Sequence, residues 1–206
     1  KAATEAVRET EGQILCQNGE AVEAYYFSTS AGVTSTDEIW GSDEAAPYLR
    51  SVPCKFDEEE PWSSWIVELP WKMLEDRIRE KGEGTVLRSV TVTRRSESGA
   101  ATALEAVSDK DSCIIENEYE IRKFLAPVNC MITEKDGTET AGGSLLPSAY
   151  FELERTQNGN LQVRGKGYGH GVGMSQTGAD KMAEQGYDYR EILDYFFRNI
   201  TVENLG

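Results

Sequence analysis

The residues with the clearest chemical potential lie near the C-terminal end of the chain, at positions 165–176. Glycines at every second position, from Gly165 to Gly173, leave a backbone that can approach a ligand closely. His170, the single histidine of the 206 residues, lies among them. The segment does not fit a phosphate-binding loop, because no G-x-G-x-x-G spacing can be laid over it. We therefore expect it to contact a polar ligand that is not a nucleotide.

A second candidate segment, residues 25–36, places hydroxyl groups and Gly32 directly after an expected strand. Loops at strand ends often carry binding residues. One alternative is a serine hydrolase, in which His170 would act as the base for Ser28 or Ser30. No G-x-S-x-G elbow frames these serines, so we favour hydrogen bonding to a polar ligand.

Composition excludes several classes of partner. The formal net charge is −15, with 36 acidic and 21 basic residues. Nucleic acids bind by exchanging counterions for Lys and Arg, so we expect no nucleic-acid partner. The acidic run at residues 57–60, beside Pro61, is typical of an exposed loop, and we assign it no function. Apolar runs fall far short of the ~20 residues that a membrane span needs, so no transmembrane segment is expected.

The four cysteines form no recognisable metal motif. Cys16, Cys54, Cys113 and Cys130 lack C-x-x-C spacing, and a single histidine adds few further ligands. We expect neither a metal nor a cofactor in this chain. For an exported protein, disulfides among these cysteines and isolated buried thiols both remain open.

Turn signals and apolar periodicity predict an α+β fold, with antiparallel hairpins, a mixed sheet and a few helices. Hairpin turns are expected at Asn18-Gly19, Ser98-Gly99 and Asn158-Gly159. The strands that flank them are 13–17 with 21–27, 86–93 with 101–107, and 150–153 with 161–164, and a further strand is expected at 65–69. Helices are expected at 71–80, at 176–185 and after Asp188, which forms a capping pair with Glu191. The last helix should bury the stripe Tyr189, Ile192, Leu193, Phe196 and Phe197.

Residues 165–176, continued by 177–187 and 191–196, resemble the signature of the stage II sporulation protein D family. This family contains peptidoglycan lytic transglycosylases and amidase enhancers. The upstream matches are Ala6-Val7, Thr10, Gly12, residues 26–30, Gly32, Thr34, Trp40, residues 47–49, residues 120–122 and Pro147-Ser148. Ala31 departs from the glycine that relatives often carry. The resemblance implies one domain over residues 1–206 that lacks its N-terminal part, with a smaller inserted lobe at about 55–145 and a groove between two lobes.

The resemblance implies a lytic transglycosylase, in which a glutamic acid protonates the glycosidic oxygen and the muramyl hydroxyl closes an anhydro ring. A partly desolvated cleft keeps such an acid protonated by raising its pKa. The family carries this glutamate on an alanine-rich helix that precedes the matched region, so we expect it upstream of Lys1 and do not assign the role to Glu5. The zinc-binding segment of some relatives is likewise expected upstream.

The same resemblance implies a set of substrate-binding residues. They are Ser28, Ser30, Gly32, Thr34, Tyr168, Gly169, His170, Gly171, Ser175 and Gln176. His170 would donate a hydrogen bond to glycan or orient the acid. The implied partners are peptidoglycan glycan strands and other cell-wall hydrolases. The implied location is extracytoplasmic, in the cell wall or on the outer face of a membrane such as the one that engulfs a forespore. The alternatives are a non-catalytic peptidoglycan-binding module and an enhancer of a cell-wall amidase.

Overall fold

Antiparallel strands make up much of the regular structure. The computed structural model describes residues 2–42 and 44–205, and within these residues the strands form four sheets. The largest sheet has the strand order β10-β11-β4-β8-β9. Its strands are β4 (Trp65–Leu69), β8 (Met131–Glu134), β9 (Glu139–Ala141), β10 (Phe151–Arg155) and β11 (Leu161–Gly165).

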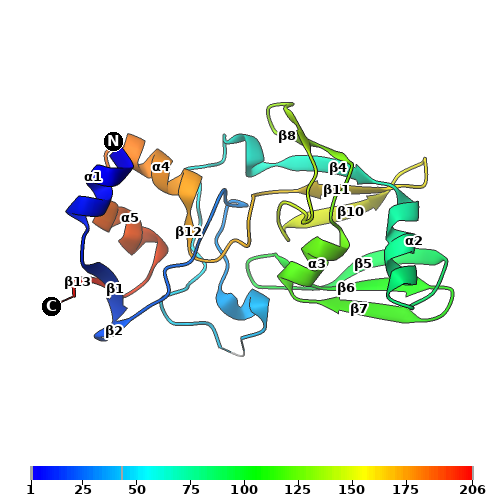
Figure 1. The fold of residues 1–206 in the computed structure, drawn as a ribbon, viewed down its shortest axis with the longest axis horizontal. Helices are drawn as coiled ribbons and strands as arrows, with labels where there is room; N and C mark the ends of the chain where they lie inside the picture. The colour runs from blue at the N-terminus through cyan, green and yellow to red at the C-terminus, as the bar shows by residue number, and fades with distance from the viewer. Residues whose placement is uncertain (1, 43, 206) are drawn as a thin grey trace.

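A second sheet and two helices pack with this large sheet around one hydrophobic core. In the view of Figure 1, the sheet of β5 (Leu87–Arg95), β6 (Ala101–Ser108) and β7 (Ser112–Glu116) lies below the five-stranded sheet, with α3 (Glu118–Phe124) between them and α2 (Trp71–Glu80) at the far end. The core includes Trp65, Leu69, Leu74, Leu104 and Ile121. Residues of β4 alternate between buried and exposed, as expected for a strand with one face on a core.

A second hydrophobic core lies toward the end of the molecule that holds both chain termini (Figure 1). It includes Ile39, Leu49, Val172, Met182 and Phe196. The helices at this end are α1 (Ala2–Glu9), α4 (Gln176–Glu184) and α5 (Tyr189–Phe196). The strands are β1 (Gln13–Gln17), β2 (Glu20–Ala21) and β13 (Thr201–Asn204) in one sheet, and the parallel pair β3 (Tyr26–Phe27) and β12 (Met174–Ser175). Two 3-10 turns, η1 (Asp37–Trp40) and η2 (Pro61–Ser63), complete the regular structure of the described residues.

The α+β prediction is confirmed, and so are its main local signals. All three expected hairpin turns join antiparallel strands: β1 to β2, β5 to β6, and β10 to β11. Asp188 and Glu191 form the predicted capping box at the start of α5. The predicted inserted lobe and the groove between lobes stay predictions.

Two expectations about buried and extended segments are wrong. The strand expected at 21–27 ends after Ala21, because the chain leaves β1 and residues 26–27 pair instead with β12. Tyr189, expected in the buried stripe of the last helix, is 42% exposed, since its hydroxyl donates to Gln13 at the protein surface (3.0 Å). Leu193 is half-buried, and the other stripe residues are buried.

The structure also bears on the cysteines and on membrane insertion. All four cysteines are free thiols; Cys16 and Cys54 are buried, and the other two are half-buried. Over residues 2–42 and 44–205, no helix combines the length and the apolar character needed to cross a bilayer.

Candidate functional site

The two segments singled out in the sequence lie side by side. Thr29 and Tyr168 exchange two backbone hydrogen bonds, with N···O distances of 3.1 and 2.8 Å. Next to them, β3 and β12 pair in parallel, and the Met174 amide donates to the Tyr25 carbonyl (3.0 Å). These contacts make one continuous structure of the hydroxyl-rich loop and the glycine-rich turn.

The alternating glycines explain how the two segments pack so closely. Gly167, Gly169, Gly171 and Gly173 all have positive φ angles, a backbone region that residues with a side chain rarely adopt. A Cβ atom on Gly173 would clash with the carbonyl oxygen of Tyr25, and one on Gly169 would lie 2.7 Å from the Cβ of Phe27. The close approach that the glycines permit is therefore between the two protein segments.

Asp57 joins both segments from the interior. Its side chain is 0% exposed. It accepts hydrogen bonds from the amide and hydroxyl of Ser30 (2.8 and 2.6 Å) and from the hydroxyl of Ser175 (2.6 Å). The expectation that residues 57–60 form an exposed acidic loop is wrong at this position, because Asp57 turns inward to the hydroxyl groups. Glu58 and Glu59 are exposed, as expected.

Three of the predicted substrate-binding hydroxyls are buried and used inside the protein. Ser30 and Ser175 bind Asp57, and Ser175 also caps α4 by accepting from the Gly178 amide (3.2 Å). The Thr34 hydroxyl accepts from the Val52 amide (3.0 Å). The hydroxyl groups of these residues therefore stabilise the site through hydrogen bonds inside the protein.

Most of the remaining predicted residues are at least partly accessible to solvent. Tyr168 is 42% exposed and its ring packs edge-on against Trp62, with ring centroids 4.7 Å apart. Gln176 is exposed, Gly171 is buried, and Ser28, Gly32, Gly169 and His170 are half-buried. Contact of this group with a ligand stays a prediction.

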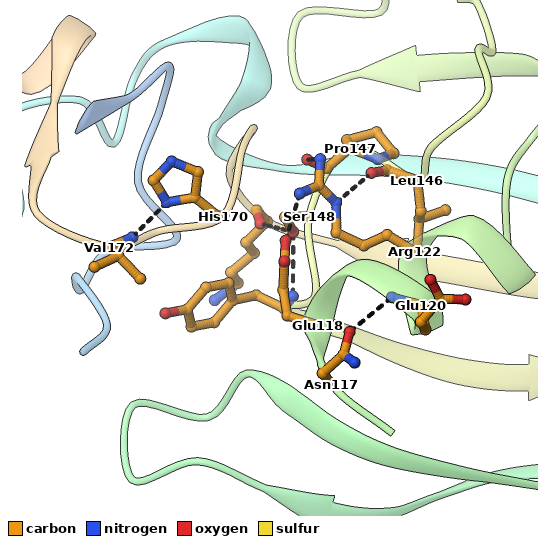
Figure 2. Close-up of polar contacts among 11 residues, drawn as sticks. Asn117, Glu118, Glu120, Arg122, Leu146, Pro147, Ser148, His170 and Val172 are labelled. Carbon is orange, nitrogen blue, oxygen red and sulfur yellow. Dashed lines mark hydrogen bonds and ion pairs between the residues drawn. The ribbon is translucent and has the colours of Figure 1, made fainter. Parts of the chain in front are cut away.

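His170 is held in one orientation by aromatic rings and by the turn that carries it. Trp40 and Phe27 pack edge-on against the imidazole at centroid distances of 5.2 and 5.8 Å. Its Nδ1 atom accepts from the Val172 amide at 3.1 Å, as Figure 2 shows. Because Nδ1 is an acceptor, the proton of the neutral ring is on Nε2.

The environment of His170 favours this neutral form. Burial lowers the pKa of the imidazole below its ordinary value, and the positive charge of Arg122 lowers it further. The nearby Tyr26 backbone acts in the opposite direction, raising the pKa by a smaller amount. At neutral pH the ring can therefore donate one hydrogen bond through Nε2 and carries no charge.

We expect a proton NMR titration of the folded protein to show a His170 midpoint below about 6.5, the ordinary value that the unfolded protein in urea should approach. Because the pKa of His170 is lower in the folded state, the unfolded state takes up the proton at a higher pH than the folded state does. His170 therefore stabilises the fold fully above about pH 6.5, and this contribution is lost as pH falls through the window between the two midpoints. His170→Gln should remove that part of the pH dependence of unfolding. A folded midpoint at or above the unfolded one would contradict the burial argument.

A buried ion pair supports the glycine-rich turn from the other side. Glu118 and Arg122, one helical turn apart on α3, form this pair (Figure 2). Arg122 also donates to the carbonyls of Leu146 (2.8 Å) and Pro147 (3.2 Å). The Pro147 carbonyl in turn accepts from the Gly169 amide at 2.8 Å. The Pro147 carbonyl therefore connects the Arg122 guanidinium to the turn that carries His170.

The structure gives no support to a serine hydrolase. The Ser30 hydroxyl donates to Asp57, and the Ser28 hydroxyl lies 3.3 Å from that of Thr29. Both serines and His170 are described, and no hydrogen bond joins the imidazole to either hydroxyl. A nucleophile with an adjacent base is therefore not assembled here. Within the described part of the chain, no three His, Cys, Asp or Glu side chains are grouped to hold a metal ion.

Two concave surfaces adjoin the turn. One, of about 370 Å³, is lined by Trp62, Tyr168, Arg122 and the segment at 140–147. The other, of about 250 Å³, is lined by Ser30, Ala31, Gly32, Glu58, Ser63, Ser64, Lys135 and Lys166. Polar and aromatic groups thus surround the two segments on open surfaces suited to a polar ligand.

Comparison with known proteins agrees with the resemblance of the sequence. A family model described as a domain of unknown function (DUF8618) matches residues 50–173. Stage II sporulation protein D of Bacillus amyloliquefaciens is 31% identical over 98% of this chain and 51% of the relative. The protein of the same name from Bacillus subtilis (strain 168) is 30% identical over 98% of this chain and 51% of its own length. An amidase enhancer from Bacillus subtilis (strain 168) is 23% identical over 96% of this chain and 32% of its own length.

This chain spans about half the length of the stage II sporulation proteins that it matches, at 51% of each. The matches nevertheless cover nearly all of the chain, so they include both segments of the site. The predicted resemblance to stage II sporulation protein D is confirmed. The chain belongs to the family described as a domain of unknown function (DUF8618).

Proposed function

We propose that this chain forms the glycan-binding part of a cell-wall protein that cleaves peptidoglycan strands as a lytic transglycosylase. The observation that carries the proposal is the exposed Tyr168 ring beside the neutral, oriented His170 on a turn fixed by Asp57. The names of the related proteins from Bacillus support a role at the cell wall. Because peptidoglycan lies outside the cytoplasmic membrane, the protein would act there, in the wall or at the outer face of a membrane.

Exposed aromatic rings suit a sugar polymer. Tyr26, Trp40 and Tyr168 are all exposed; Tyr26 and Tyr168 belong to the two segments of the site, and Trp40 packs against His170. The apolar C–H faces of a sugar ring can pack on such rings, while its hydroxyls need polar partners. Gln176 and the Nε2–H of His170 would supply polar partners. This combination matches a neutral carbohydrate better than a charged ligand.

The cleavage step needs a partly desolvated acid that faces the glycan, and the carboxyl groups at the described site do not match this. Glu58 lines the smaller concave surface but is exposed, so it lacks the desolvation that keeps such an acid protonated. Protonation of the glycosidic oxygen releases one sugar, and the C6 hydroxyl of the muramyl residue attacks C1 and loses its proton, so no water is consumed. Asp57 is enclosed by hydroxyl donors and Glu118 is paired with Arg122, so neither reaches a bound glycan. We therefore assign the acid to a glutamate upstream of Lys1, and to His170 a supporting hydrogen bond.

The test uses the full-length protein with purified peptidoglycan. New anhydromuramyl ends, measured by mass spectrometry of released fragments, would support the proposal. His170→Ala should slow their release about tenfold, as expected for the loss of one oriented hydrogen bond. If the full-length protein neither releases such ends nor sediments with peptidoglycan, the proposal is wrong.

A second candidate function is the enhancement of a cell-wall amidase. It is favoured by the relative named amidase enhancer, which matches 96% of this chain. Under this hypothesis the protein sediments with peptidoglycan and raises the rate at which an amidase releases stem peptides, but forms no anhydromuramyl ends. The two functions are thus separated by the chemical identity of the products.

Tyr168→Ala should weaken sedimentation of the chain with peptidoglycan about tenfold, which corresponds to about 1.4 kcal/mol. The reason is the loss of an exposed ring on which a sugar face can pack. Tyr189→Ala is the matched control, since Tyr189 is equally exposed, at 42%, and lies at the start of α5 rather than on the turn. Equal binding by the two variants would remove Tyr168 from the binding surface.

A further inference from the structure

The concave surface of about 370 Å³ beside Tyr168 has the size of a small-ligand pocket. One wall is the corner formed by the Trp62 and Tyr168 rings, which meet at 65°. The rest of the lining includes the end of β9 and the segment that follows it, with Ala141, Ser144 and Leu145. The pocket thus lies directly next to the exposed tyrosine of the candidate site.

Arg122 lines this pocket and has N–H groups beyond those used inside the protein. The residue as a whole is only 8% exposed. A guanidinium has five N–H groups, and three are used by Leu146, Pro147 and Glu118. Two N–H groups remain on a residue that lines the pocket.

The pairing of Arg122 decides what kind of acceptor it suits. Glu118 is 2% exposed and neutralises the guanidinium inside the protein. A second carboxylate brought into this pocket would be repelled by Glu118 and would lose its hydration. A neutral carbonyl oxygen can accept from the remaining N–H groups without that cost. The pocket therefore favours an amide over an anion.

Apolar groups in the same pocket suit a small alkyl substituent. Ile132, Ala141 and Leu145 contribute side chains to its lining. A methyl group attached to the amide carbonyl would lie against such surface and be removed from water. We propose that this pocket binds the acetamido group of an N-acetylated aminosugar, with the sugar ring against the Trp62 and Tyr168 corner.

The proposal rests on the proposed glycan function and names the group that the site recognises. The same amide-plus-methyl chemistry occurs in a peptide that contains alanine. We choose the aminosugar because its rigid ring presents a flat C–H face that can pack on the aromatic corner. A short peptide of alanine has no such ring. A peptide ligand is kept as an outcome that would overturn the proposal.

The experiment compares three probes on the purified chain by saturation-transfer NMR and titration: N,N′-diacetylchitobiose, its deacetylated form chitobiose, and N-acetyl-alanyl-alanine. We expect the acetamido methyl protons of diacetylchitobiose to receive the strongest saturation. We expect chitobiose to bind at least tenfold more weakly. Equal binding of the two sugars, or tighter binding of the peptide, would overturn the proposal.

Pocket-filling variants connect this preference to the structure. Ser144→Trp should weaken diacetylchitobiose binding at least tenfold, because Ser144 is exposed and lines the pocket. Ala141→Phe fills the same pocket from β9, and keeps the test decisive if the first variant does not fold. Ser112→Trp is the matched control, since Ser112 is exposed on β7 and does not line the pocket.

The failure of this proposal can be told apart from that of the glycan function. If a folded Ser144→Trp or Ala141→Phe variant binds diacetylchitobiose like the unaltered chain, the pocket is not the acetamido site. Continued sedimentation with peptidoglycan would then leave the glycan function standing. If the unaltered chain binds neither diacetylchitobiose nor peptidoglycan, both proposals are wrong.

Discussion

Asp57→Ala is expected to lower the free energy of unfolding by about 4 kcal/mol, because several buried hydrogen bonds to one carboxylate are lost together. The variant leaves the Ser30 amide and the hydroxyls of Ser30 and Ser175 without their acceptor, in a space closed to solvent. Such a loss is a large part of the roughly 5–15 kcal/mol that stabilises a typical domain. Urea unfolding followed by circular dichroism measures the change.

The neighbouring residue supplies the control for this prediction. Glu58 is exposed, so Glu58→Ala should change the free energy of unfolding by no more than about 0.5 kcal/mol. Asp57→Asn should fall between the two, because its amide oxygen can still accept while its NH₂ group faces donors. An Asp57→Ala protein as stable as the Glu58→Ala protein would show that Asp57 does not hold the two segments together.

Gly173→Ala is expected to cost about 3 kcal/mol or more of stability. Two effects add at this position. The backbone has φ of +80°, which an L side chain rarely adopts, and the new methyl group would clash with the Tyr25 carbonyl. Relief of the clash would separate β3 from β12, so the loss should appear in glycan binding as well as in urea unfolding.

Gly186 allows the two effects to be measured separately. Its φ is +95°, but a Cβ atom there would have no neighbour within 4 Å. Gly186→Ala should therefore cost only the left-handed backbone, about 1–2 kcal/mol. The difference between the two variants gives the cost of pushing the two segments apart. If both variants lose the same stability, the close packing at Gly173 contributes nothing.

Local signals account for the parts of the fold that the sequence predicted. Asn-Gly turns and the Asp188–Glu191 capping pair act within a few residues, so they can be identified without knowledge of the rest of the chain. The parallel pairing of β3 with β12 joins residues far apart in the sequence and leaves no local pattern. The short helix α3 is not among the expected helices, although Asn117, whose side chain accepts from the Glu120 amide, is a residue type typical of helix starts.

The structure brings the two candidate segments together, but the roles of their residues inside the fold are not predictable from the sequence. The glycines were expected to admit a ligand, whereas the structure uses them to admit the neighbouring segment. Asp57 has the appearance of a surface residue because three glutamates follow it. Its burial depends on Ser30 and Ser175, which are 27 and 118 residues away. An acceptor shared by distant hydroxyls can be recognised only once the chain is folded.

Ser175 has a consequence for how this region opens. Its hydroxyl is at once the cap of α4 and a donor to Asp57. If the first turn of α4 unwinds, the Ser175 hydroxyl loses the Gly178 amide and is no longer held in place to donate to Asp57. If the hydrogen bond to Asp57 breaks first, Ser175 is no longer held in place to cap the helix. Hydrogen exchange in the first turn of α4 and in the loop around Ser30 should therefore be governed by a single cooperative opening.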